Sequence, residues 1–364
     1  MSSLPANRSY YPALDGLRGV AILLVVFLHN FGFLSYFFFG WLGVDLFFVL
    51  SGFLITEILL KTAGQKHFLR NFYMRRMLRI FPIYYITLIF CFLVLPHILP
   101  TYVSMGYYTS NQVWLWTYLQ NWLFIFESPR GTPMLLHTWS LAVEEQFYLI
   151  WPLTILLIRK PKVLLMLAGF ILVMTGIVRF LLWEYQIKDL AYASLYTFTR
   201  IDGLCVGAML ALLMHRYPGF LKKYTTVIVL LMAAINFGFY FINGRLAFTL
   251  PYLAVAGYTT FAVLFGLLVH EAVTGESKLV RLILDNRLLK FFGRISYGLY
   301  VYHWPVYILL FPLLNKLLRS TGIISGRLAE AAGAVAATAI AVGISVISYK
   351  YIESFFLKYK TRFT

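Results

Sequence analysis

The first apolar segment of the chain, LDGLRGVAILLVVFLHNFGFL, contains two ionisable side chains, Arg18 and His29. Such a group inside a hydrocarbon-embedded helix is costly and usually has a function. The two residues are three helical turns plus about 20° apart, so they share one helix face and lie about 16 Å apart along the axis. An imidazole can act as a base near neutral pH, and a guanidinium can bind an anion. The structural alternative is a snorkelling arginine with a packed polar histidine.

Other apolar segments of the chain also contain ionisable residues. Their charges nearly balance, which predicts that they pair around a hydrated cavity inside the membrane. Structural roles stay open for single residues, because Asp202 could neutralise Arg200 and Asp45 could cap the start of its helix. The set comprises Asp45, Glu144, Glu145, Arg179, Arg200, Asp202 and His303.

One of these segments also carries a stripe of polar and aromatic side chains. Ser140, Glu144, Tyr148 and Trp151 follow the spacing i, i+4, i+8 and i+11, which places them on one face of a helix. Such a face either lines a site or holds neighbouring helices together through hydrogen bonds. The spacing alone allows both interpretations.

The elements that carry these residues are predicted to be membrane-spanning helices. The chain is 61% hydrophobic and 12% charged, with a mean hydropathy of +0.78, which excludes a water-soluble globular protein. Cys91 and Cys205 fall in apolar segments and are predicted to be buried thiols without a disulfide or metal role. The hydropathy pattern predicts an all-α integral membrane protein, a polytopic bundle forming a single domain over residues 1–364. Its ten predicted spans are 13–34, 41–60, 80–99, 136–158, 163–183, 191–214, 225–242, 247–270, 295–314 and 328–349.

The net charge of +17 is distributed unevenly over the connections between the spans. With alternate connections on opposite sides, 23 of the 31 lysines and arginines fall on one side and 6 on the other. The positive-inside rule then places both termini in the cytoplasm. This distribution indicates affinity for anionic lipid headgroups instead of nucleic acid.

Two connections have a distinctive composition. The connection 61–79 carries six basic residues and no acidic one, which either sets the topology or grips a phosphorylated cytosolic ligand. The connection 100–135 contains NQVWLWTYLQNWLFIF, which predicts an interfacial or re-entrant helix. Small residues at Gly203 and Gly207, and in the stretch AEAAGAVAATAIAVG, predict close helix packing.

Several strings occur in the order found in a known family. They are LDGLRGVAILLVVFLH, GWLGVDLFFVLSGFLI, FYMRRMLRIFPIYY, HTWSLAVEEQFYLIWP, TRIDGLCVGAML, ISYGLYVYHWPV and SYKYIESFF. The chain resembles the acyltransferase-3 family of integral membrane O-acyltransferases. The resemblance implies acyl-CoA, usually acetyl-CoA, as the cytoplasmic donor. It implies a hydroxyl acceptor on an extracytoplasmic glycan such as lipopolysaccharide O-antigen or exopolysaccharide, and a location in the bacterial inner (cytoplasmic) membrane. Because the chain ends about a dozen residues past the last span, a stand-alone form without an added hydrolase-like domain is expected.

The resemblance also suggests roles for individual residues. Acyl transfer to an alcohol needs a base for the hydroxyl proton and a cation or hydrogen-bond donor for the thioester oxygen. His29 is the predicted base, with Glu144 either orienting it or sharing the base role, and Asp45 as a third catalytic residue. No metal is expected. The predicted residues for CoA are Arg18, Arg75, Arg76 and Arg79, and those for the acceptor are Arg200, Asp202, His303 and Tyr148. The alternative function is a proton-coupled transporter or glycan flippase, since buried Arg, Glu and His residues also suit a carrier.

Overall fold

The computed structural model describes residues 11–98, 105–127, 133–185, 195–217, 219, 221, 225–243, 257–275, 277–320 and 326–363. This part of the chain is almost entirely helical and contains no strand, which confirms the all-α prediction. The helices of at least 15 residues are α1 (Pro12–Phe31), α2 (Leu42–Thr62), α3 (Phe68–Ile89), α8 (Trp139–Ile158), α9 (Pro161–Glu184), α12 (Asp202–Arg216), α13 (Thr225–Asn243), α14 (Tyr258–Thr274), α16 (Arg287–Ser320) and α17 (Gly326–Ser348).

Seven helical segments in the described ranges are long and apolar enough to cross a membrane, which makes this a multi-pass membrane protein. An eighth would form if α14 and the short α15 (Lys278–Leu284), bent by 92°, were one broken span. The count of ten stays a prediction, as does the orientation of the termini. Three predicted spans lie partly outside the described residues, at 99, 191–194 and 247–256.

The chain forms two compact units, each built from separate stretches of sequence. Unit 1 takes its described residues from 1–21, 44–66 and 140–293, and unit 2 takes them from 22–43, 67–139 and 294–364. Two long helices, α1 and α16, begin in unit 1 and end in unit 2. The candidate site residues are therefore described unit by unit.

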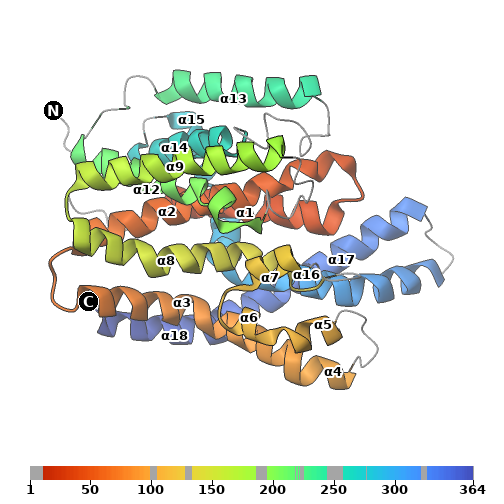
Figure 1. The fold of residues 1–364 in the computed structure, drawn as a ribbon. Coiled ribbons are helices and arrows are strands. Elements are labelled where there is room, and N and C mark those ends of the chain that lie inside the picture. The colour runs from red at the N-terminus through yellow and green to blue at the C-terminus, as the bar shows by residue number, and fades with distance from the viewer. Residues whose placement is uncertain are drawn as a thin grey trace. The chain divides into compact units, whose positions relative to one another are not determined.

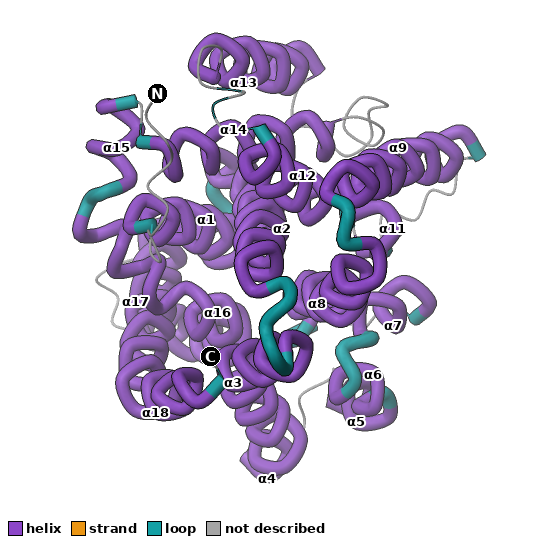
Figure 2. The backbone as a smooth tube through the Cα atoms, turned by 90° about the vertical axis from the view of Figure 1, so that its left-hand side faces the viewer, coloured by secondary structure: helices purple, strands orange, loops and turns teal. Residues whose placement is uncertain are grey.

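In unit 1, α12 packs against α2, α9 and α14 (Figures 1 and 2). Glycines allow the close approach to α2. A Cβ atom at Gly207 would lie 2.1 Å from the backbone oxygen of Val49, and one at Gly203 would lie 2.9 Å from Cβ of Phe48. The prediction that these small residues serve helix packing is confirmed.

In unit 2, the last span continues from α17 through a π-helical turn, η5 (Tyr349–Glu353), into α18 (Ser354–Lys358) and η6 (Tyr359–Arg362). Helix α3 packs along this end of the span (Figure 1). Four of the eight alanines in the stretch predicted to pack closely are buried in α17, namely Ala329, Ala334, Ala337 and Ala341. Toward its other end α3 continues through a π-helical turn η2 (Phe90–Val94) into α4 (Leu95–Ile98).

Three expected boundaries were wrong. The basic residues Arg75, Arg76 and Arg79 lie on α3 instead of in a connection, because a helix continues past the apolar stretch that hydropathy detects. The predicted sixth span is interrupted, so Arg200 ends α11 (Thr197–Arg200) and Asp202 begins α12. The described part of the aromatic-rich connection forms separate short helices, α5 (Met105–Ser110), α6 (Gln112–Trp116) and α7 (Gln120–Phe126). The last two are separated at Tyr118, whose φ of 55° is incompatible with a continuous helix.

Candidate active site

His29 and His303 form a hydrogen-bonded pair within unit 2. Nδ1 of His29, on α1, lies 2.8 Å from Nε2 of His303, on α16, and their ring centroids are 5.0 Å apart. His303 is completely buried, whereas His29 is partly exposed. The structure therefore brings together two histidines that are 274 residues apart in the sequence.

The hydrogen bonds of His303 define which nitrogen of His29 is basic. Nδ1 of His303 lies 2.7 Å from the backbone oxygen of Tyr300 and 3.0 Å from that of Leu299. A carbonyl oxygen only accepts, so this Nδ1 carries the hydrogen, and Nε2 of neutral His303 has the lone pair. Nδ1–H of His29 therefore donates to His303, and Nε2 of His29 keeps a lone pair that can accept a proton.

A third histidine, His137, lies beside this pair. Its ring is edge-on to that of His303, with centroids 5.2 Å apart, and its Nε2–H donates to the backbone oxygen of Val301 at 3.3 Å. This carbonyl is available because Pro305, four residues later, has no N–H to occupy it. His137 was missed at the sequence level, although it is the first residue of the string HTWSLAVEEQFYLIWP.

An aromatic side chain also lies beside His29. The ring of Trp304 lies 5.0 Å from that of His29, and its indole N–H donates to the backbone oxygen of Pro133 at 3.2 Å. Tyr307 stacks on Trp304, with ring planes 8° apart. His29 therefore contacts both a histidine, through a hydrogen bond, and an indole.

Glu144, the predicted partner of His29, belongs to unit 1 and makes a different contact there. Its Oε1 accepts a hydrogen bond from Ser51 of α2 at 2.7 Å, and Trp151 of the same stripe donates to Thr56 of α2 at 2.8 Å. The stripe on α8 therefore faces α2 at both positions. A catalytic role for Glu144 and an acceptor role for Tyr148 stay predictions.

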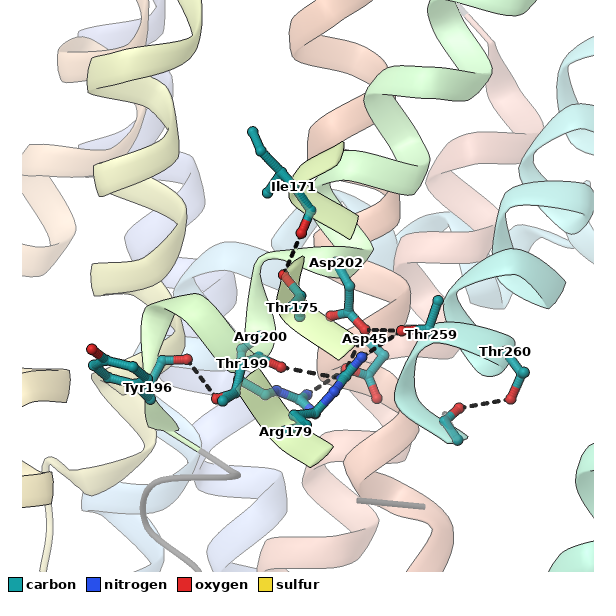
Figure 3. Close-up of polar contacts among 11 residues, drawn as sticks. Asp45, Ile171, Thr175, Arg179, Tyr196, Thr199, Arg200, Asp202, Thr259 and Thr260 are labelled. Carbon is teal, nitrogen blue, oxygen red and sulfur yellow. Dashed lines mark hydrogen bonds and ion pairs between the residues drawn. The ribbon is translucent and has the colours of Figure 1, made fainter. Parts of the chain in front are cut away.

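The buried charges of unit 1 form one compact network (Figure 3). Arg200 pairs with Asp45 of α2, while Arg179 of α9 pairs with Asp202 at 2.9 Å. Thr259 of α14 accepts a hydrogen bond from Arg179 and donates one to Asp202 at 2.9 Å. Arg200 therefore forms its direct ion pair with Asp45 and not with its neighbour Asp202, since each arginine is paired with a carboxylate from a different helix.

This network has no net charge, and it joins the elements of unit 1. The guanidinium of Arg200 also stacks over the ring of Tyr258, 4.0 Å from its centroid. All four charged side chains are at most 4% exposed. Their contacts support a structural role, and the predicted roles of Asp45, Arg200 and Asp202 in chemistry or acceptor binding stay predictions.

The arginines predicted to bind the donor lie on two helices. Arg18 of α1 belongs to unit 1 and pairs with Asp15, one turn earlier, at 3.1 Å. Arg75, Arg76 and Arg79 lie on α3 in unit 2, where Arg76 stacks over Phe72 at 5.8 Å. A contact of any of them with CoA stays a prediction.

Comparison with known proteins shows which family this chain resembles over nearly its whole length. A family model described as an acyltransferase domain matches residues 11–350. A peptidoglycan O-acetyltransferase of Listeria monocytogenes, OatA, is 29% identical, with the match covering 96% of this chain and 56% of that protein. A Bacillus subtilis protein, YrhL, provisionally named a peptidoglycan O-acetyltransferase, is 32% identical, over 84% of this chain and 50% of its own length. A provisionally named O-acetyltransferase of Staphylococcus aureus is 31% identical, over 82% and 50%.

The chain thus spans about half the length of the curated relatives it matches. No solved structure matches it significantly. The matches agree with the resemblance seen in the sequence motifs and do not favour a transporter or flippase.

Proposed function

We propose that this chain, which belongs to the acyltransferase-3 family, is a membrane O-acetyltransferase that moves an acetyl group from acetyl-CoA to a glycan hydroxyl. The observation that supports this most directly is the lone pair on Nε2 of His29, which follows from the contact with His303 at 2.8 Å. An alcohol is a poor nucleophile until its proton is removed, and an oriented imidazole can remove it.

In the proposed reaction, Nε2 of His29 takes the proton of the acceptor hydroxyl as its oxygen attacks the thioester carbonyl carbon. The positive charge that forms on His29 is stabilised by its Nδ1–H donating to His303. The tetrahedral intermediate then collapses, the carbon–sulfur bond breaks, and the proton passes from His29 to the departing thiolate. The products are the acetylated glycan and free CoA.

The proposed acceptor is an extracytoplasmic glycan. The names of two relatives refer to peptidoglycan, which makes it the first acceptor to test for this chain. Lipopolysaccharide O-antigen and exopolysaccharide, suggested by the motif resemblance, are the next candidates. All three offer secondary or primary sugar hydroxyls to the same base.

The proposed setting is the bacterial inner membrane, with residues 1–364 forming one acyltransferase domain of ten spans and both termini in the cytoplasm. Acetyl-CoA would enter from the cytoplasmic side, where the basic residues concentrate. Arg18, Arg75, Arg76 and Arg79 would hold its phosphates through charge-assisted hydrogen bonds.

The test uses purified full-length chain with labelled acetyl-CoA and, separately, peptidoglycan fragments, O-antigen and exopolysaccharide. His29→Ala should lower the transfer rate by about 10²–10⁴-fold while leaving donor affinity nearly unchanged. His97→Ala changes an exposed histidine of α4 and should not affect the rate. Near-normal turnover by well-folded His29→Ala protein would contradict the assignment of the base.

A further inference from the structure

The end of the last span in unit 2 carries a buried carboxylate that the proposed reaction does not use. Glu353 is the last residue of the π-helical turn η5 and is only 6% exposed. Its Oε1 is buried and has no hydrogen-bond partner among the described residues. Single π-helical turns inside α-helices are often found at functional sites. Glu353 belongs to the string SYKYIESFF, for which the sequence suggested no role.

The neighbouring helices leave space for this carboxylate. A Cβ atom at Gly298 of α16 would lie 2.9 Å from Oε1 of Glu353, so only glycine fits there without moving the carboxylate. Helix α3 packs against η5, and Tyr297 of α16 donates to the backbone oxygen of Ile80 on α3 at 2.7 Å. Three helical segments thus surround the carboxylate of Glu353.

One arginine of α3, Arg79, is near this carboxylate but does not neutralise it by direct contact. Arg79 interacts electrostatically with Glu353, yet no ion pair within 4.0 Å joins them. Arg75 lies one turn before Arg79 on the same helix face, and its Nε is buried without a hydrogen-bond partner in the described ranges. The described part of the chain gives neither arginine a hydrogen bond or an ion pair.

The contrast with unit 1 is informative. In the charge network there, each of the four charged side chains is in a direct ion pair. Burying a charge without such a pair costs several kcal/mol, which proteins seldom tolerate without a compensating function. Glu353, Arg79 and Arg75 therefore have the properties of a site that a ligand completes.

We propose that Glu353, Arg79 and Arg75 bind a phosphate-bearing ligand that also carries a neighbouring hydroxyl or N–H donor. The two guanidinium groups would hold phosphate oxygens, and the carboxylate of Glu353 would accept the hydrogen bond of the donor group. Coenzyme A has this chemistry, and so does a phosphatidylethanolamine headgroup. The choice of coenzyme A rests on the proposed function. The site adds Glu353 to the residues proposed to bind acetyl-CoA.

The test measures coenzyme A binding by full-length chain in phosphatidylcholine nanodiscs, because this lipid has no hydroxyl or N–H donor in its headgroup. Glu353→Gln and Arg79→Gln should each weaken binding about tenfold or more, as expected for the loss of one charge-assisted hydrogen bond. The matched control is Glu330→Gln, which changes a glutamate of α17 that is paired with Arg319 at 3.1 Å. Its affinity for coenzyme A should equal that of the wild type.

Thermal unfolding separates ligand binding from folding. Without ligand, Glu353→Gln should be at least as stable as the wild type, because it removes an unpaired buried charge. The rise in Tm that coenzyme A produces should nevertheless become smaller. Gly298→Ala provides an independent variant, since its methyl group would displace the carboxylate of Glu353 and weaken binding without changing any charge.

Replacing phosphatidylcholine by phosphatidylethanolamine distinguishes the two sources of the ligand. The site would be a lipid site if phosphatidylethanolamine stabilised the wild type but not Glu353→Gln, while the affinity for coenzyme A was the same in both. Unchanged affinity for both ligands in Glu353→Gln and Arg79→Gln would overturn the proposal. If the protein bound coenzyme A through Glu353 but showed no transferase activity, only the proposed function would be refuted.

Discussion

At the scale of single residues, the Nδ1–H of His29 is held by another imidazole, that of His303. Nε2 of His303 can accept the hydrogen of His29 only because its own Nδ1–H is held by backbone oxygens of the same helix, 2.7 and 3.0 Å away. This arrangement fixes the tautomer of His29 without placing a negative charge in the membrane. The catalytic competence of His29 therefore depends on a residue that does not touch the reacting atoms.

His303→Gln should retain more activity than His303→Ala. A glutamine carbonyl oxygen can still accept the Nδ1–H of His29, whereas alanine leaves that hydrogen without its partner and the ring free to change tautomer. We expect a fall in kcat of about tenfold or more for alanine and a smaller fall for glutamine, with the KM for acetyl-CoA unchanged in both. Equal rates for the two variants would show that His303 only fills space.

Trp304→Ala should raise the KM for the glycan acceptor while leaving that for acetyl-CoA unchanged. The indole lies 5.0 Å from the ring of His29, where an acceptor sugar could pack its C–H groups against the aromatic face. We expect a change of about tenfold in steady-state measurements with varied acceptor. The control is Trp116→Ala, which removes an indole stacked on Tyr85 at 5.6 Å and should not change acceptor KM.

At the scale of helices, the charge network of unit 1 holds α2, α9, α12 and α14 together. Removing one member should leave an uncompensated buried charge, so Asp45→Ala should lower the free energy of unfolding by about 3–5 kcal/mol. The double variant Asp45→Leu with Arg200→Met removes both charges of one pair and should recover most of that loss. Denaturant unfolding and transfer activity are measured on both. A stable double variant without activity would instead show that Asp45 or Arg200 takes part in the chemistry or in acceptor binding.

The sequence was sufficient to predict the helices but not the pairing of their polar residues. Hydropathy located the apolar part of each long helix, and motif order pointed to His29 and His303 separately. The partners of a buried group come from distant parts of the chain, as for Asp45 and Arg200, which are 155 residues apart. Local reasoning therefore offered Asp202 as the partner of its neighbour Arg200, whose direct ion pair is with Asp45. Helix breaks were also missed, because the positive φ of Tyr118 has no composition signal.

At the scale of the whole molecule, the distribution of basic residues makes a topology prediction. A cysteine introduced at Lys66 should be labelled by an impermeant reagent from the cytoplasmic side only, and one at Lys316 from the opposite side only. The same experiment at Arg130 concerns a residue outside the described ranges. Labelling of Lys66 and Lys316 positions from one side would contradict the proposed ten-span arrangement.

The hydrogen bonds of His303 also have a consequence for membrane energetics. A peptide carbonyl is not a base, so the chain of hydrogen bonds from His29 through His303 ends at the backbone oxygens of Tyr300 and Leu299. A proton taken up by His29 has no onward route along this chain to the other side of the membrane. Acetyl transfer should therefore be electroneutral, and its rate in sealed vesicles should not change when an uncoupler collapses the pH gradient. A rate that follows the gradient would require a different proton path.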